Sequence, residues 1–204
     1  MYKLTINVVA FYSDVDPNSV SRSVALDAME LLKPVINDRC SDLSVKYSLT
    51  DEKCGSIKLV KNHRLKDGSH VDYRECTGEN FKADFLVRCT FFSPMIPRIF
   101  PATNSKSYAQ GLGWKSNMCI SRDFATHVPT LVHEFIHALG QDPDNRDDNR
   151  GKYPGSDFDD LVQGNDEHVY WNQYLLRKAV DSIRKEQKEA MHYLSPRPAF
   201  LAAR

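Results

Sequence analysis

Long hydrophobic runs, a surplus of charge of either sign and closely spaced cysteine pairs are all missing from this sequence of 204 residues. No apolar run reaches the roughly 18 residues that a membrane span needs, which disfavours an integral membrane protein. Lys plus Arg and Asp plus Glu both number 27, so there is no net charge that would attract nucleic acids or membrane surfaces in general. The five cysteines form no C-x-x-C pair, which argues against a cysteine zinc ribbon.

The composition that remains is typical of a folded globular domain, with 41% hydrophobic and 26% charged residues. We find no internal repeat and no linker, and therefore expect a single domain over residues 1–204. The first ten residues are too polar for a signal peptide and are more typical of a strand. The odd number of cysteines leaves at least one thiol unpaired in a monomer, so both a secreted protein with disulfides and one with five buried thiols fit the sequence.

The hydrophobic pattern predicts a chain that mixes strands and helices. Alternating and β-rich residues indicate strands over residues 3–12, 43–49, 83–92, 108–113 and 117–121. Helical spacing indicates a first helix that ends at Pro34, a second over about 126–139 before Gly140, and a third over 166–190. The strand at 83–92 is the strongest and is expected near the centre of a sheet, while the turn at 66–69 has room for a hairpin.

The segment that indicates chemistry is His133-Glu134-Phe135-Ile136-His137. Residues four apart on a helix share a face, so the imidazoles of His133 and His137 can bind one ion. Neutral imidazole nitrogen suits zinc at roughly 2.0–2.1 Å. Glu134 is placed to take a proton from a water molecule that the metal has made more acidic. The alternative is an ordinary amphipathic helix with two exposed or hydrogen-bonded histidines.

This stretch, extended to Gly140, resembles the zinc motif of the metzincin peptidases, most closely that of the astacin family. The resemblance implies an α/β (α+β) fold with a twisted mixed sheet and helices in an amino-terminal lobe over 1–140. It places the zinc helix on the floor of a cleft and a small, mainly helical or irregular lobe over 141–204. It also implies that the strand around 108–113 forms the rim of the cleft and pairs with an extended substrate.

A second resemblance lies at Met191-His192-Tyr193, which is similar to the Met-His-Tyr turn beneath the zinc of astacin-like enzymes. It implies that Tyr193 stabilises the oxyanion. The alternative is that Met191 continues the apolar stripe of a long helix.

The third metal ligand departs from the metzincin motif, because the position three residues after Gly140 is Pro143, which has no donor. Carboxylates are legitimate zinc ligands. A shift of one residue would supply Asp142 or Asp144, and we slightly favour Asp144. Glu167 and His168 are further candidates, and in thermolysin-like enzymes a second helix supplies a Glu as the third ligand.

The sequence thus predicts a secreted, monomeric zinc metalloendopeptidase with one catalytic zinc ion. Its partner is a protein or peptide substrate, and neither nucleic acid nor a membrane is expected. The metal ligands are His133, His137 and Asp144, and the catalytic residues are Glu134 and Tyr193. The alternatives are a catalytically impaired metzincin-like binding protein and a thermolysin-like peptidase. His127 is expected to cap a helix or lie at the surface, and Trp114 to pack in the interior.

Overall fold

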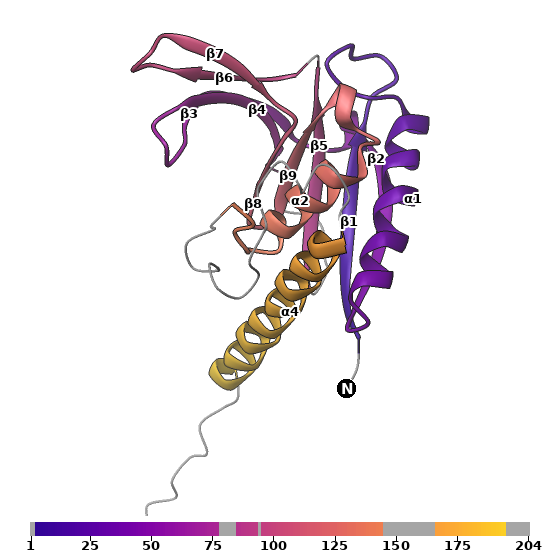
Figure 1. Cartoon of the computed structure of the whole chain (residues 1–204). Coiled ribbons are helices and arrows are strands. Elements are labelled where there is room, and N and C mark those ends of the chain that lie inside the picture. Colours follow the sequence, from indigo (N-terminus) through magenta and orange to yellow (C-terminus); the bar gives the residue numbers. More distant parts are fainter. Residues whose placement is uncertain (1–2, 78–84, 94, 145–165, 195–204) are drawn as a thin grey trace, which may run out of the picture.

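The computed structural model describes residues 3–77, 85–93, 95–144 and 166–194, with residues 166–172 and 191–194 described by their backbone alone. The chain forms two sheets, and Figure 1 shows the helices gathered on one side of the first sheet and the second sheet above and beside it. The expectation of a mixed α/β chain is confirmed at this coarse level.

The first sheet has five strands in the order β2-β1-β5-β9-β8. They span Leu43–Asp51 (β2), Leu4–Tyr12 (β1), Leu86–Phe92 (β5), Asn117–Ser121 (β9) and Gly111–Trp114 (β8). The first four are parallel, and β8 runs antiparallel to β9 at the edge. The strand expected near 83–92 is therefore central, as the sequence predicted.

Both faces of this sheet are covered, and the alternation within β1 shows how. Ile6, Val8 and Ala10 point into the main core beneath the helices. Val9 and Phe11 point to the opposite face, where they pack with Cys76 of the second sheet. Strands buried on both faces are expected to be nearly continuous runs of apolar residues, which is the pattern of β1.

The first helix, α1 (Arg22–Arg39), covers the main core through buried residues such as Ala28 and Ile36. The expectation that this helix ends at Pro34 is wrong, because α1 runs on for more than another turn. Proline removes one backbone donor from the helix. The turn beyond it persists because Ile36 is fully buried and its carbonyl accepts a hydrogen bond from the N–H of Cys40 at 3.0 Å.

The second sheet has four antiparallel strands in the order β3-β4-β6-β7. They span Ile57–Arg64 (β3), His70–Cys76 (β4), Ile96–Phe100 (β6) and Ser105–Ala109 (β7). The β3–β4 hairpin turns at residues 66–69, as predicted. The strand β6 was not expected, since it lies in a proline-rich stretch.

The long helix α4 (Asp166–Leu194) packs its buried side chains, among them Leu176 and Val180, into the main core. Lys115, in the turn between β8 and β9, forms an ion pair with Glu186 of this helix at 3.1 Å. Among the helices in the described part of the chain, none combines the length and apolar character needed to cross a membrane. All five cysteines are free thiols.

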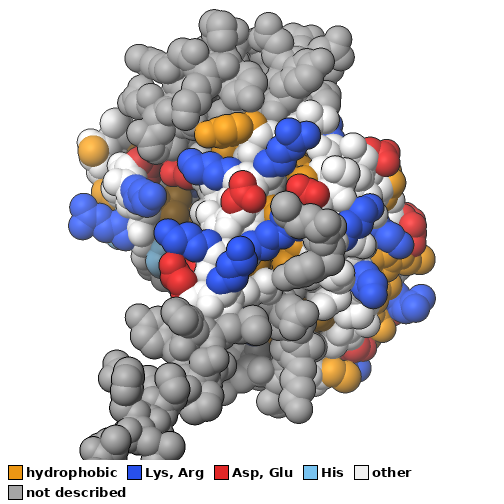
Figure 2. All heavy atoms as spheres, turned by 90° about the horizontal axis from the view of Figure 1, so that it is seen from below, with side chains coloured by type: hydrophobic (Ala, Val, Ile, Leu, Met, Phe, Trp, Pro, Cys, Tyr) orange, Lys and Arg blue, Asp and Glu red, His pale blue; other side chains and the backbone are white. Residues whose placement is uncertain are grey.

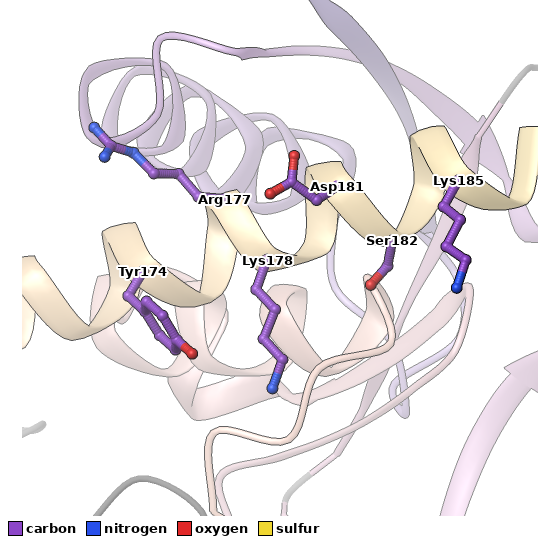
Figure 3. A pocket seen from close by; sticks show the side chains of 6 residues that line it. All are labelled: Tyr174, Arg177, Lys178, Asp181, Ser182 and Lys185. Atoms are coloured by element: carbon purple, nitrogen blue, oxygen red, sulfur yellow. The ribbon is translucent and has the colours of Figure 1, made fainter. Parts of the chain in front are cut away.

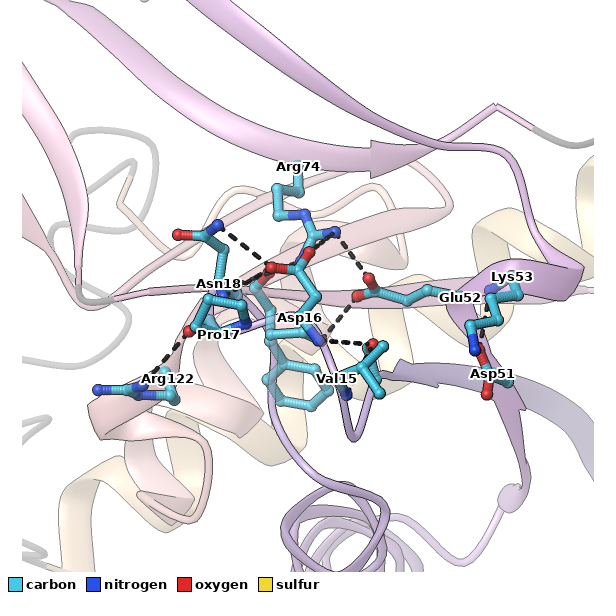
Figure 4. A network of polar contacts seen from close by, with 12 residues as sticks. Val15, Asp16, Pro17, Asn18, Asp51, Glu52, Lys53, Arg74 and Arg122 are labelled. Atoms are coloured by element: carbon cyan, nitrogen blue, oxygen red, sulfur yellow. Dashed lines mark hydrogen bonds and ion pairs between the residues drawn. The ribbon is translucent and has the colours of Figure 1, made fainter.

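A buried ion-pair network closes the end of the first sheet where β1, β2 and β5 finish (Figure 4). Arg74 of β4 donates to Glu52, in the short helical turn Glu52–Cys54, at 2.7 Å and to Asp16 at 3.1 Å. The side chains of Arg74 and Glu52 are only 11% and 9% exposed. The carboxyl end of a parallel sheet is a common ligand-binding position. Here the guanidinium of Arg74 occupies it and joins the second sheet to the first.

Candidate metal centre

The helix α2 (Val128–Ala138) presents the predicted metal-binding residues. His127 is its N-cap residue and Pro129 lies in the first turn, where a missing N–H is tolerated. Gly140 follows the helix with a φ of 83°, a backbone conformation that favours glycine. The expected helix, its proline start and its glycine stop are all confirmed.

His133, His137 and Asp144 converge on one point beside α2. Nε2 of His133 lies 3.3 Å from Oδ1 of Asp144, and Nε2 of His137 lies 3.1 Å from Oδ2. The three donor atoms all lie within 4.8 Å of one another, a spacing that could hold a metal ion. The structure therefore brings together the two histidines and the aspartate that the sequence favoured.

Asp144 is held in its anionic form by the two imidazoles. Burial alone would raise the pKa of this carboxyl group, but the hydrogen bonds with His133 and His137 outweigh it and hold the pKa well below its usual range. Asp142, the competing candidate, lies outside the group. Its Oδ1 accepts a hydrogen bond from the backbone N–H of Asp144 at 3.2 Å and so supports the turn.

Glu134 points away from solvent, toward β8, and is only 7% exposed. Burial raises the pKa of its carboxyl group to about 7, although His133 acts in the opposite direction. A carboxyl group with a pKa near neutrality can both accept and release a proton at physiological pH. Glu134 is thus a buried carboxyl group, on the same helix as His133 and His137, whose pKa is suited to proton transfer.

The backbone of β8 approaches α2 closely because two of its residues are glycine. A Cβ atom at Gly111 would lie 2.6 Å from Cγ of Glu134, and one at Gly113 would lie 2.6 Å from both the carbonyl oxygen of Glu134 and Cβ of His137. On the other side of the strand, the ring of Trp114 packs against Tyr73 at 4.7 Å. Trp114 is a packing residue, as expected.

Hydrogen bonds fasten β8 to α2 at both ends. At its start, the hydroxyl of Thr130 donates to Oε1 of Gln110 at 2.7 Å and lies 2.9 Å from Nδ1 of His127. At its end, the N–H of Ser116 donates to the carbonyl of Ala138 at 2.8 Å. Sequence reasoning did not identify these contacts. The alternation of Gly111 and Gly113 beside a predicted helix was the signal that could have indicated the close approach.

Several predicted residues lie outside what the structure describes. The backbone of Met191-His192-Tyr193 belongs to the last turn of α4, so this segment continues the long helix. The side chains of Tyr193, Glu167 and His168 are not among the described ones. The role of Tyr193 and the ligand alternatives on α4 stay predictions.

A separate hollow of about 400 Å³ lies on α4 (Figure 3). It is lined by Tyr174, Arg177, Lys178, Asp181, Ser182 and Lys185. None of the described lining residues comes from α2 or from the 142–144 segment. The hollow is therefore distinct from the group of His133, His137 and Asp144.

Comparison of the chain with known protein families, with curated protein sequences and with solved structures finds no match in any of the three.

Proposed function

We propose that this protein is a zinc-dependent metalloendopeptidase of metzincin type. The observation that carries the proposal is the convergence of two imidazole nitrogens and one carboxylate beside a buried glutamate on the same helix. The expected substrate is an extended polypeptide that pairs with the edge strand β8.

The donor set suits the metal. Nε2 of His133, Nε2 of His137 and one carboxylate oxygen of Asp144 would be its ligands. Three protein ligands of nitrogen and oxygen type, with a fourth position left open, are typical of catalytic zinc sites. A zinc ion bound there would activate a water molecule and polarise the carbonyl group of the substrate.

Glu134 supplies the proton transfers. Its carboxylate accepts the proton of the attacking water and then donates it to the nitrogen of the departing amine, so that the peptide bond is hydrolysed without a covalent enzyme intermediate. Contact with Gly111 and Gly113 fixes the side chain on the side of α2 that faces β8. In this proposal a substrate on the β8 edge lies next to the proton carrier.

Two measurements test the proposal. Metal analysis of the purified protein should find about one zinc ion per chain, and the protein should cleave an unfolded polypeptide. Glu134→Gln should retain the zinc and lose at least about a hundredfold in kcat, because a general base typically contributes 10²–10⁴-fold. Unchanged cleavage by this variant would reject the role of Glu134, and zinc-loaded protein that cleaves nothing would favour the binding-protein alternative.

The third ligand is tested by three matched variants. We expect Asp144→Asn to lose zinc, whereas Asp142→Asn and Glu167→Gln should retain it. Loss of zinc in Glu167→Gln with retention in Asp144→Asn would select the thermolysin-like arrangement instead. The Asp142→Asn variant serves as the control, because this residue supports the same turn without joining the group.

A further inference from the structure

The second sheet carries positive charge that the rest of the chain balances. Residues 57–76 and 96–109 contain seven Lys and Arg residues but only three Asp and Glu residues, in a chain with no net charge. The seven are Lys58, Lys61, Arg64, Lys66, Arg74, Arg98 and Lys106. The charge is therefore distributed unevenly, although the total is zero.

Some of these cations form ion pairs with neighbouring carboxylates. Arg74 is buried between Asp16 and Glu52, and Arg98 pairs with Asp67. Lys58 lies 4.0 Å from Glu75. The positive charge that remains available belongs to other residues of the sheet.

Three of the remaining cations gather at one end of the β3–β4 hairpin. Lys61 and Arg64 are exposed and form no ion pair with the other described residues. Lys66 pairs with Asp142 at 3.9 Å, but its side chain is 98% exposed, so this pair is weak and the ammonium group stays accessible to a ligand. We call Lys61, Arg64 and Lys66 the basic hairpin tip. A solvated cluster of like charge attracts polypeptides of the opposite charge over about one Debye length, about 10 Å at 0.1 M salt.

The basic hairpin tip lies beside the candidate metal centre. Nζ of Lys66 is 3.9 Å from a carboxylate oxygen of Asp142, whose other oxygen binds the N–H of Asp144. The hairpin is thus in contact with the turn that carries the proposed third ligand. A polypeptide bound at the metal centre would pass within range of these charges.

We infer that the basic hairpin tip is a docking surface for acidic segments of the polypeptide substrate. This inference rests on the proposed peptidase function, since it names the substrate class for the same site. It names a polypeptide because Lys66 contacts Asp142 of the turn that carries Asp144, and a nucleic acid is an outcome that the test distinguishes. An acidic peptide can place its carboxylates on the cations and neutral residues elsewhere.

Exposed cations also occur outside this sheet, so a control variant must remove the same amount of charge elsewhere. Figure 2 shows Lys and Arg side chains gathered around a few Asp and Glu residues on the face seen from below. On α4, Lys178, Lys185 and Lys188 are all exposed. Removal of these three charges lowers the net charge as much as removal of the basic hairpin tip does.

The test compares two fluorescein-labelled peptides that differ only in three Glu or three Gln residues. Binding is measured by anisotropy with the Glu134→Gln protein, so the readout does not depend on cleavage. We expect the Glu peptide to bind about tenfold more tightly at 20 mM salt and less than about threefold more tightly at 0.5 M salt. Lys61→Gln/Arg64→Gln/Lys66→Gln should abolish the preference, and Lys178→Gln/Lys185→Gln/Lys188→Gln should retain it.

Equal binding of the two peptides, or an unchanged preference in the hairpin variant, would overturn the inference. Tighter binding of a labelled single-stranded oligonucleotide than of the Glu peptide would also overturn it. A preference for the Glu peptide in a zinc-loaded wild-type protein that cleaves no unfolded polypeptide would reject the peptidase function and leave the docking surface standing. The two failures are therefore distinguishable.

Discussion

Glu134 is the residue whose surroundings differ most from those of a free side chain. It lies on the same helix as two partly buried imidazoles, whose side chains are 18% and 17% exposed, and its own residue is only 7% exposed. Burial raises the pKa of this group from its ordinary value of 4.5 to about 7. A buried glutamate that has no metal nearby therefore lowers the stability of the fold whenever it is ionised.

This makes the stability of the metal-free protein depend on pH. Between pH 4.5 and 7 the folded state keeps the proton of Glu134, whereas the unfolded chain has released it, so the free energy of unfolding falls as pH rises. The fall is about 3 kcal/mol over this window at 1.36 kcal/mol per pKa unit. Urea unfolding in a chelating buffer at pH 4.5, 5.5, 6.5 and 7.5 would measure it.

Glu134→Gln is the matched control, because glutamine keeps the shape and cannot ionise. Subtracting its free energy of unfolding from that of the wild-type protein isolates this group from the histidines and from Asp144. A difference that stays constant across the pH window would contradict the raised pKa.

The histidine pair could be predicted from the sequence because its geometry is local. Residues four apart on a helix always share a face, so His133 and His137 needed only a correct helix. Asp144 could also be predicted as a candidate, because it follows the glycine that ends the helix by only a few residues. The contacts of Glu134 with Gly111 and Gly113 join two separate segments, and no local rule places those segments side by side.

Among the elements, β8 and α2 form the interface on which the proposed chemistry depends. Thr130 precedes Glu134 by four residues, so both side chains project from the same face of α2 toward β8. Since the hydroxyl proton of Thr130 goes to Gln110, the same oxygen accepts the hydrogen bond from Nδ1 of His127. This series of hydrogen bonds fixes β8 to α2 one helical turn before the metal centre.

Thr130→Val should therefore reduce both stability and catalysis. The side chain is 5% exposed, and loss of its hydroxyl leaves Gln110 Oε1 and His127 Nδ1 without this partner, at an expected cost of about 1–3 kcal/mol. A small displacement of Glu134 from β8 should lower kcat about tenfold with KM and zinc content unchanged. Chemical denaturation and steady-state kinetics would measure the two effects.

Thr130→Ser separates hydrogen bonding from packing, because serine keeps the hydroxyl and removes only the methyl group. We expect it to restore kcat. A serine variant as impaired in kcat as the valine variant would show that the methyl group, and not the hydrogen bond, positions the strand.

Helices and strands with a regular pattern of apolar residues were predictable, and those without such a pattern were not. The alternation or apolar runs of β1, β2 and β5 and the capped helix α2 all follow from local pattern. The strand β6 was missed because Pro97 and Pro101 are typical of loops. Pro97 lies opposite Tyr108 of β7 and outside the short pairing with β4, which involves only Arg98 and Ile99, so its missing N–H interrupts no bond with β4.

At the scale of the whole molecule, the sequence could not predict that the strands divide into two sheets. The division depends on contacts between distant segments, such as Arg74 of the second sheet with Asp16 and Glu52 at the end of the first. In the sequence these residues are ordinary charged positions in polar stretches. Only the folded chain shows that all three share one site, in which Arg74 and Glu52 are buried.

Arg74→Met should destabilise the protein more than the loss of any exposed ion pair. The substitution leaves the carboxylate of Glu52 buried without a counter-ion, with the hydroxyl of Ser19 still donating to it at 2.7 Å, and loss of one partner of a buried ion pair costs about 3–5 kcal/mol. Arg98→Met is the matched control, because the side chains of Arg98 and Asp67 are 34% and 43% exposed and such pairs contribute at most about 1 kcal/mol. Urea unfolding at pH 7 measures both variants.

The double variant Arg74→Met/Glu52→Gln tests whether the unpaired charge of Glu52 causes the loss of stability. Removing the charge of Glu52 together with that of Arg74 should recover part of the lost stability, because a neutral amide is less costly to bury than an unpaired carboxylate. Equal losses for Arg74→Met and Arg98→Met would show that Asp16 and Glu52 are hydrated without Arg74. In that case the apolar contacts alone would hold the second sheet against the first, and with it the hairpin beside the metal centre.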